Sequence, residues 1–276
     1  MRSKNIRIII LIASICAAIM TACDSKKSSE TSSNKDSKTA SVSDITEINT
    51  EDSNFEIPEN AVYCQTKLEY IQDKLSTISY TFYDEHDNCI YLYSQPAEDL
   101  EDEWQTTYDC SYSYKYNDDG TISEMSMVMQ DSSPLLYQFE YSDDKKVQNE
   151  TAYRNDEIWS ITISELDEYS NPVRNEISYV QNEKLNTVTT YEYEYDSEGR
   201  ILVEKYISDK DISNNTKYYT YDTNGNIANL ETQYDNMDLT LLTKYTYNSD
   251  NRLINQEEFT NGEESSYIEY KYEFYN

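Results

Sequence analysis

A tyrosine-rich unit recurs at a nearly fixed interval, and it constrains the fold of this chain more than any other feature. The clearest copy, which starts at Tyr191, reads Tyr-Glu-Tyr-Glu-Tyr-Asp-Ser-Glu-Gly-Arg, and similar copies start at Tyr219 and Tyr245. Four weaker copies precede these three. An interval of 25 to 33 residues indicates repeated supersecondary units. The anchor residues of the seven units are Tyr83, Tyr116, Tyr141, Leu166, Tyr195, Tyr221 and Tyr247.

Each unit predicts a β-hairpin. The alternation Tyr-x-Tyr-x-Tyr is typical of a strand that presents its tyrosines on one face. The Asp-x-x-Gly that follows favours a tight turn, because Asp bonds the following backbone and Gly accepts a positive φ. Asp87 and Ser170 stand at the glycine position of weaker copies and Asn251 at that of the copy that starts at Tyr245, whereas Lys145 fits poorly, so we expect a different turn there.

A returning strand follows each turn, and polar turns separate the units. Asn261-Gly262 is the strongest hairpin signal in the chain. Counting both kinds of turn predicts about 16 short strands and no helix. The expected fold is all-β: an antiparallel meander of repeated hairpins that forms one curved, twisted, open sheet.

The segment Tyr193–Leu202 resembles the YD repeat of the Rhs family, whose unit reads Tyr-x-Tyr-Asp-x-x-Gly-Arg-Leu. The resemblance covers most of 75–276 and implies an exported, curved β-sheet at the cell surface. The chain departs from the family in having about seven units and arginine after the glycine position only at Arg200 and Arg252. It also ends in another predicted strand, so the toxin role of Rhs proteins does not carry over.

The N-terminus predicts export and lipid anchoring. A basic start precedes a largely apolar stretch of 13 residues, Ile8 to Met20, which is too short to span a bilayer. The sequence Met20-Thr21-Ala22-Cys23 then resembles the lipobox of bacterial lipoproteins, which implies cleavage after Ala22 and acylation of Cys23. The alternative is an ordinary secretory signal. The lipobox reading places the protein on the extracytoplasmic face of a cell membrane, held by the lipid on Cys23.

Composition divides the chain into three parts. We expect a signal peptide at 1–22, an acylated N-terminus and disordered Ser/Thr/Asp/Lys-rich tether at 23–60, and one Tyr-rich repeat domain at 61–276. Loss of the three basic signal residues changes the net charge from −31 to −34. So acidic a chain is not a nucleic-acid-binding protein, because phosphate binding needs a basic surface. It favours cationic partners or a plain solvated surface.

Little in the sequence suggests catalysis. His86 is the only histidine and lies in the first repeat turn, and no motif of a nucleophile, zinc or phosphate site appears. The acidic turns at Asp118-Asp119 and Asp222-Thr223-Asn224 have oxygens that suit Ca²⁺, but turn chemistry explains them more simply. We therefore predict a protein that is not an enzyme, with no cofactor and no metal.

The cysteines after the anchor are Cys64, Cys89 and Cys110, an odd number. Cys89 and Cys110 flank one loop, so antiparallel pairing about it suggests a cross-strand disulfide in an exported protein. A register slip of one residue would place the two cysteines on opposite faces of the sheet.

The tyrosines are the candidate binding residues. In the simpler interpretation they form the core of a sheet that is poor in aliphatic residues; in the functional one they form an aromatic platform for glycans or peptides. The residues of the candidate binding face are Tyr193, Tyr195, Tyr219, Tyr221, Tyr245 and Tyr247.

Three functions remain open. The leading hypothesis is a non-enzymatic surface module that binds a glycan or a protein partner. The second is a structural or accessory lipoprotein that assembles through exposed sheet edges. The third is an envelope hydrolase, which needs two carboxylates at a fixed separation in a cleft.

Overall fold

The computed structural model describes residues 56–97, 107–130, 132–210 and 214–275. The expected signal peptide, Cys23 and nearly all of the tether lie outside these residues. Within them the chain forms sixteen strands and one short 3₁₀ helix, η2 (Glu183–Leu185). The strands are β1 (Tyr63–Ile71), β2 (Lys74–Tyr83), β3 (Cys89–Pro96), β4 (Tyr108–Tyr116), β5 (Ile122–Met129), β6 (Leu135–Tyr141), β7 (Val147–Arg154), β8 (Glu157–Leu166), β9 (Pro172–Tyr179), β10 (Thr187–Tyr195), β11 (Ile201–Ser208), β12 (Asn215–Tyr221), β13 (Ile227–Tyr234), β14 (Thr240–Tyr247), β15 (Leu253–Thr260) and β16 (Glu263–Phe274).

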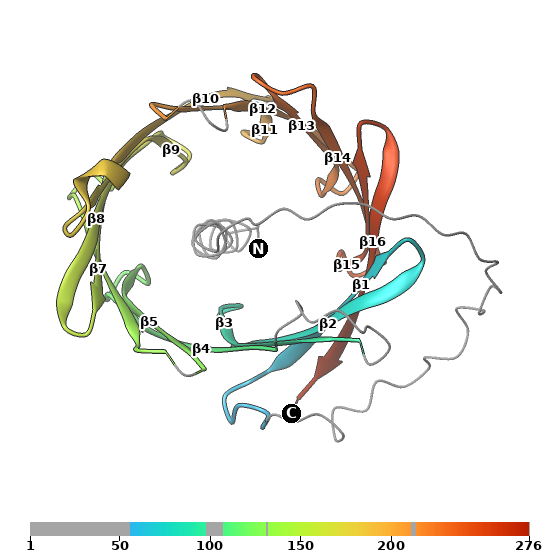
Figure 1. Ribbon diagram of the computed structural model, residues 1–276, viewed down its shortest axis with the longest axis horizontal. Coiled ribbons are helices and arrows are strands. Elements are labelled where there is room, and N and C mark those ends of the chain that lie inside the picture. Colours follow the sequence, from blue (N-terminus) through green and yellow to red (C-terminus); the bar gives the residue numbers. More distant parts are fainter. Residues whose placement is uncertain (1–55, 98–106, 131, 211–213, 276) are drawn as a thin grey trace, which may run out of the picture.

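The strands form an antiparallel meander, as predicted, but the meander closes on itself. Each strand pairs with its neighbours in the chain, and β1 pairs with β16 from Tyr63 opposite Phe274 to Tyr70 opposite Tyr267. Figure 1 shows the resulting ring of strands. The prediction of an open sheet was wrong. Repeat patterns specify the pairing of neighbouring strands, whereas the accumulated curvature brings the first and last strands together, and their pairing removes both edges.

Six of the seven repeat hairpins use one turn geometry. In the clearest copy, the Gly199 amide bonds the Asp196 carbonyl, the Asp196 amide bonds the Arg200 carbonyl, and Gly199 has a φ of 76°. The register shifts by one residue between Glu194 and Tyr195, which marks a bulge. This is the three-residue hairpin in which a type I turn is followed by a left-handed residue.

The β6–β7 turn differs from the other six, as the misfit of Lys145 predicted. Lys145 does adopt the left-handed conformation, with a φ of 55°. The turn nevertheless closes one residue later, because the Ser142 amide bonds the carbonyl of Val147. The β6–β7 ladder then runs without a register shift.

The two faces of the wall are distinguished by exposure. Tyr193, Glu204 and Lys217 lie opposite one another on β10, β11 and β12 and therefore share one face. Glu192 and Lys205 share the other. The Glu204 side chain is 13% exposed, whereas that of Glu192 is 69% exposed. Because side chains converge on the concave side of a closed sheet, the Glu204 face is the lumenal face.

Buried apolar side chains gather in the first half of the barrel. Among the described residues they form two clusters, of which one lies on β4 to β7 and the other on β1 to β3. In β8 to β16 the only apolar side chain classed as buried is Ile268. The first cluster comprises Cys110, Tyr112, Met125, Met127, Leu135, Tyr137, Phe139 and Ala152; the second comprises Cys64, Tyr80, Phe82, Ile90 and Tyr93.

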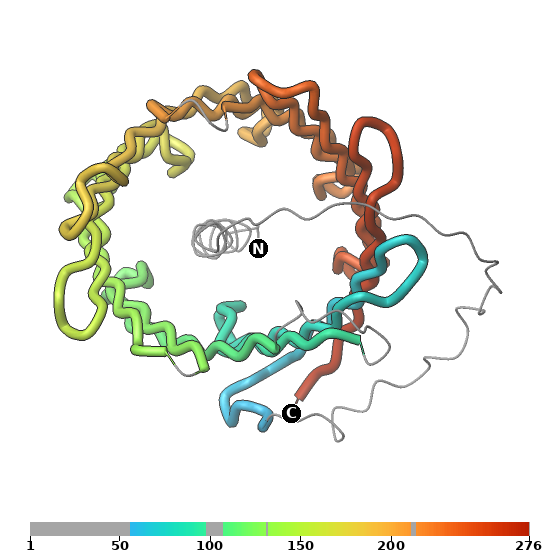
Figure 2. The backbone as a smooth tube through the Cα atoms, viewed as in Figure 1, coloured from blue at the N-terminus to red at the C-terminus, as the bar shows by residue number. Residues whose placement is uncertain are grey.

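Hairpin ends leave the wall in two directions. In Figures 1 and 2 several turns of the repeat type curl towards the barrel axis, while the β1–β2, β7–β8 and β15–β16 hairpins project outwards. The β1–β2 and β15–β16 hairpins project next to each other, where the barrel closes. The barrel thus has turns that curl towards its axis and a pair of external hairpins at the seam.

Candidate functional site

The Asp or Asn that follows the last tyrosine of each clear repeat is used within its own turn. One carboxylate oxygen of Asp196, Oδ1, accepts the amides of Glu198 and Arg200 at 2.8 and 2.9 Å. The other, Oδ2, accepts the Arg200 Nε at 2.6 Å. The hydrogen bonds from Arg200 hold the pKa of Asp196 below its usual range. Asp222 caps its turn in the same way through Asn224 and Asn226, so turn structure accounts for this acidic cluster.

The anchor tyrosines join each repeat to the one before it. The Tyr221 hydroxyl donates to the Ile201 carbonyl at 2.6 Å, and the Arg200 guanidinium lies 4.7 Å from the centre of the Tyr221 ring. The Tyr195 hydroxyl bonds the Asp167 carboxylate and accepts a hydrogen bond from Asn171. These contacts explain the motif structurally: Asp shapes the turn, and Arg and Tyr connect successive turns.

Tyr193 and Tyr219 face the lumen beside a charged pair. The Lys217 Nζ lies 2.7 Å from Glu204 Oε1, and the Tyr219 hydroxyl donates to Glu204 Oε2 at 2.9 Å. The Tyr193 hydroxyl donates to the Pro172 carbonyl at 2.9 Å. Burial first, and the Glu204 charge second, raise the pKa of both tyrosines well above its ordinary value. Both phenols therefore stay neutral.

Tyr245 and Tyr247 on β14 complete the predicted set. Burial raises the pKa of both, that of Tyr247 to about 12. All six tyrosines are half-buried, so the wall neither covers nor fully exposes their rings. At least five of the six hydroxyls have a hydrogen bond within the protein, that of Tyr245 being with Thr243, which leaves ring surface as their main free contact area. Their role as a binding face stays a prediction.

A second polar group on the lumenal face lies on β15 and β16. Glu258 accepts Ser266 Oγ and Gln256 Nε2, each at 2.6 Å, and the Tyr270 hydroxyl donates to Gln256 at 3.0 Å. Burial holds the pKa of Tyr270 above its ordinary value. Sequence reasoning missed this group because β15 lacks the tyrosine motif. Its one signal is the alternation of Gln256 and Glu258 in a predicted strand.

The wall from β4 to β7 has a different lumenal chemistry. Met125 lies between Tyr114 and Tyr137, and Met127 between Tyr112 and Leu135. Glu150 of β7 lies opposite Phe139 on the same apolar face. Burial raises its pKa to about 7. Sequence reasoning missed this wall, for which the signal is the alternation of methionines in β5.

Two further predicted features need correction or placement. No disulfide joins Cys89 to Cys110, because Cys110 lies opposite Leu92, three positions further along β3. The predicted register was wrong by more than the tolerance of a disulfide. His86 is exposed at the β2–β3 turn, with its ring 5.5 Å from that of Tyr116.

The acidic turn at Asp118-Asp119, between β4 and β5, has part of its negative charge compensated. Lys145 of the β6–β7 turn forms an ion pair with Asp119 of the β4–β5 turn. The hydrogen bonds of Lys145 and Thr121 keep the pKa of Asp119 well below its usual range. A cleft of about 390 Å³ lies between these turns, with Phe139 and Tyr141 in its lining. Among the described residues no three His, Cys, Asp or Glu side chains gather as metal ligands.

These observations define the chain as a closed antiparallel β-barrel protein with a tyrosine- and carboxylate-lined lumen. No protein-family model and no curated sequence matches it. The solved structures that resemble it weakly include the following two. A porin-like protein from Bacteroides uniformis is 10% identical, with 77% of this chain and 96% of that chain covered and a TM-score of 0.35. A putative lipoprotein from Parabacteroides distasonis is 13% identical, with 78% and 97% covered and a TM-score of 0.25.

Scores this low support no conclusion about function, which has to come from the residues of this chain. Within the described ranges, no helix has the length and apolarity to cross a membrane.

Proposed function

We propose that this chain is a lipid-anchored, extracytoplasmic binding protein whose barrel lumen holds a glycan. The lipobox-like sequence that ends in Cys23 supports the proposed location on the membrane. The observation that carries the binding role is the pairing of tyrosine rings with fixed polar groups on the lumenal face. Tyr219 adjoins the Glu204–Lys217 pair, and Tyr270 adjoins Gln256 and Glu258.

Sugars match this surface in two respects. Their C–H faces pack on aromatic rings, and their hydroxyls exchange hydrogen bonds with carboxylates, amides and ammonium groups. The lumenal groups are held in place by one another, so little ordering would accompany binding. A barrel of sixteen strands also has room for a polymer, because barrels of this size leave an aqueous channel.

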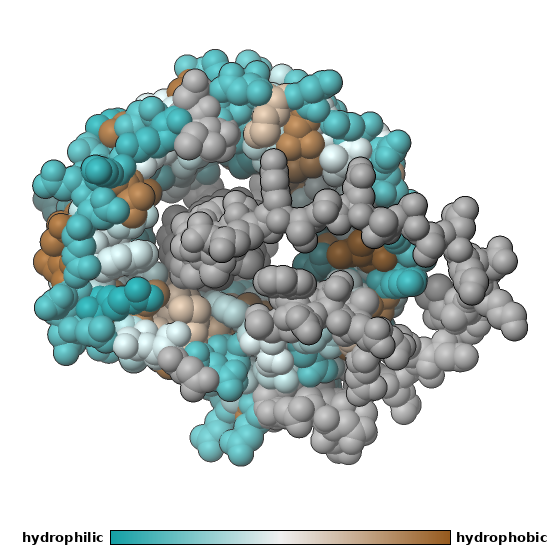
Figure 3. Space-filling view, in the orientation of Figure 1, coloured by the Kyte–Doolittle hydropathy of each residue, from teal (hydrophilic) through white to brown (hydrophobic). Residues whose placement is uncertain are grey.

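The outer face favours an aqueous location for the barrel. Glu192 and Lys205 lie at the middle of β10 and β11 on this face, and Glu165 and Arg174 lie on β8 and β9. Figure 3, which looks along the barrel axis, shows mostly hydrophilic side chains around the rim of the barrel, with separate hydrophobic spots. A barrel that spans a bilayer needs a continuous outward apolar band. We therefore infer that the lipid, rather than the barrel, holds the protein to the membrane.

The alternatives are less well supported. Assembly through sheet edges loses its basis, because β1 and β16 pair with each other. A hydrolase would need one carboxyl ready to give a proton and a second ready to attack. Glu204 is instead held in an ion pair, and Glu258 accepts two hydrogen bonds. We propose a binding protein without catalysis.

The test is binding of the full chain, in detergent, to an array of bacterial and host glycans. Glu204→Gln should weaken binding to any retained glycan by about tenfold, since a hydrogen bond to a charged group is lost. Glu192→Gln is the matched control, because it removes an acid from the outer face of the neighbouring strand. Retention of no glycan by folded wild type, or equal loss in both variants, would contradict the proposal.

A further inference from the structure

A second cavity lies outside the lumen, at the seam where the barrel closes. It has a volume of about 170 Å³ and lies between the β1–β2 and β15–β16 hairpins. Both hairpins project from the wall in Figures 1 and 2. The lining residues are Tyr70, Gln72, Asp73, Glu264, Ser265, Ser266 and Tyr267.

An aromatic pair forms one side of this seam cavity. Tyr70 and Tyr267 are direct partners across the β1–β16 ladder, and their ring centres are 6.0 Å apart with a tilt of 46°. Both rings are half-buried. Burial raises the pKa of each hydroxyl, and the charge of Glu269 raises it further, so both remain neutral hydrogen-bonding groups.

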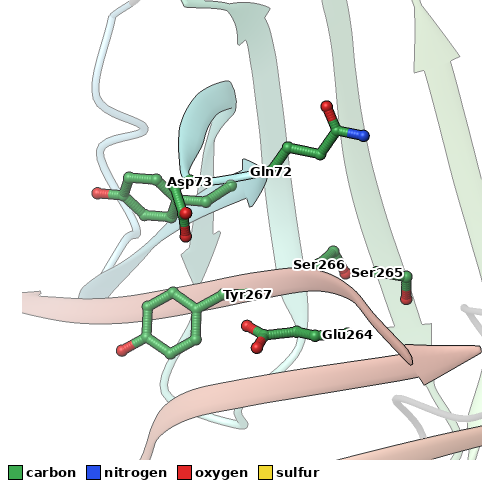
Figure 4. Close-up of a pocket in the computed structure, with 7 residues that line it drawn as sticks. Gln72, Asp73, Glu264, Ser265, Ser266 and Tyr267 are labelled. Atoms are coloured by element: carbon green, nitrogen blue, oxygen red, sulfur yellow. The ribbon is translucent and has the colours of Figure 1, made fainter. Parts of the chain in front are cut away.

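Polar groups face this pair from both hairpins. Figure 4 shows the Asp73 carboxylate pointing from its turn towards Tyr267, with Glu264 beside the ring on β16. The serines are already engaged: Ser265 Oγ donates to the Glu258 carbonyl at 3.1 Å, and Ser266 Oγ donates to its carboxylate at 2.6 Å. The two exposed carboxylates are therefore the acceptors that the cavity offers to a ligand.

The β1–β2 turn that supplies Asp73 has an unusual backbone. Gln72 and Asp73 have φ values of 49° and 62°, the two left-handed positions of a type I′ turn. The β15–β16 turn has positive φ values at the same two positions, but there the residues are Asn261 and Gly262, which adopt such values easily. Gln72 tolerates it poorly, so this turn is held by its surroundings in a conformation that directs Asp73 into the cavity.

We infer that the seam cavity binds one sugar ring, separately from any ligand in the lumen. The rings supply a surface for the C–H face of a sugar, and the Asp73 and Glu264 carboxylates accept its hydroxyl protons. The cavity is smaller than the roughly 300 Å³ at which pockets for drug-sized ligands begin, so it takes a single ring or a chain end. The inference does not depend on the proposed lumenal function.

The experiment is saturation-transfer NMR on the full chain in detergent with a panel of methyl glycosides, including N-acetylated and uronic sugars. Transfer to the ring protons of at least one neutral glycoside is expected. Tyr267→Leu and Asp73→Asn should each weaken that binding by about tenfold, while Tyr267→Phe should retain it. Asp156→Asn is the matched control, because it alters the corresponding acid of the Asn155-Asp156 hairpin, which the seam cavity does not include.

Other outcomes overturn the inference. Absence of transfer to every glycoside would do so, as would transfer that is lost in Glu204→Gln but kept in Tyr267→Leu, which would place the sugar in the lumen. Binding of propylammonium but of no glycoside, with loss in Asp73→Asn, would identify an ammonium site instead. If Tyr267→Leu loses binding and also shows a large fall in Tm, the result of Asp73→Asn decides, because Asp73 lies on an exposed turn.

Discussion

The first seven strands of the barrel and the last nine are held together in different ways. Strands β1 to β7 contain nearly all of the described apolar side chains that are buried, including Phe82 at 0% and Met127 at 1% exposure. Strands β8 to β16 contain the three clear repeats, and their rings remain half-buried. There the turn aspartates, the Arg200–Tyr221 contact and the tyrosine hydroxyls connect neighbouring units.

This difference shows what the repeat motif does. Where apolar packing is available, the motif is incomplete, and Lys145 stands at a position that glycine occupies in two of the three clear copies. Where it is scarce, Tyr-x-Tyr-Asp-x-x-Gly-Arg supplies directional contacts in its place. The two halves should therefore respond to different substitutions.

The largest expected effect is loss of a core ring in the first half. Phe82→Ala should lower the free energy of unfolding by about 3–5 kcal/mol, because it removes a fully buried ring and leaves a cavity. Leu230→Ala, a half-buried position in β13, should cost less than half as much. Urea denaturation of both variants measures the difference. Equal losses would show that the two halves pack alike.

The pH dependence of stability tests whether Glu150 is buried in the apolar lumenal wall. Its pKa is raised from 4.5 to about 7, so the folded state keeps a proton that the unfolded state loses, and stability falls as pH rises between these values. Glu150→Gln should stabilise the protein by about 2–3 kcal/mol above pH 7 and by little near pH 4. Unfolding free energies across this range check it. A benefit that does not vary with pH would contradict the assigned burial.

A smaller effect is expected from a single tyrosine hydroxyl in the second half. Tyr221→Phe removes the hydrogen bond to the Ile201 carbonyl and should cost about 1 kcal/mol. Tyr218→Phe, on the exposed face of the same strand, is the control and should change stability little. If both variants match wild type, the hydroxyls do not connect the repeats.

The smallest expected effect comes from the two arginines. Arg200→Lys loses the contact with the Tyr221 ring and part of the bond to Asp196, so its Tm should fall, though by less than for Tyr221→Phe. Arg174→Lys should be nearly neutral, because Arg174 pairs with two exposed glutamates on the outer face. Thermal unfolding monitored by circular dichroism compares the two variants. A larger fall in Tm for Arg174→Lys than for Arg200→Lys would contradict a structural role for Arg200.

Sequence reasoning reached the local structure but not its closure. Alternation and turn chemistry located the repeat hairpins and the left-handed residue of six of their seven turns, because these depend on contacts within a few residues of each other. The β1–β16 pairing depends on curvature summed over all the strands, which no single repeat encodes. The lumenal pairs Glu204–Lys217 and Gln256–Glu258 were missed because charged and amide side chains in strands give no signal until one face becomes concave.

Closure is the claim on which both the lumen and the seam cavity depend, and Cys64 permits a direct test of it. Cys64 lies opposite Glu273 across the β1–β16 ladder. Opposed residues in antiparallel strands have Cα atoms about 4.5–5.5 Å apart, within reach of a disulfide. Because burial raises the pKa of the Cys64 thiol to about 12, the oxidation needs a copper catalyst at alkaline pH.

The measurement is disulfide formation in the Glu273→Cys variant, detected by peptide mapping. Glu192→Cys, on the outer face of the distant strand β10, is the control. A closed barrel predicts an intramolecular Cys64–Cys bond in the first variant and none in the second. Absence of that bond in a folded Glu273→Cys protein would mean an open sheet. It would contradict the presence of a lumen and make assembly through exposed sheet edges a candidate function again.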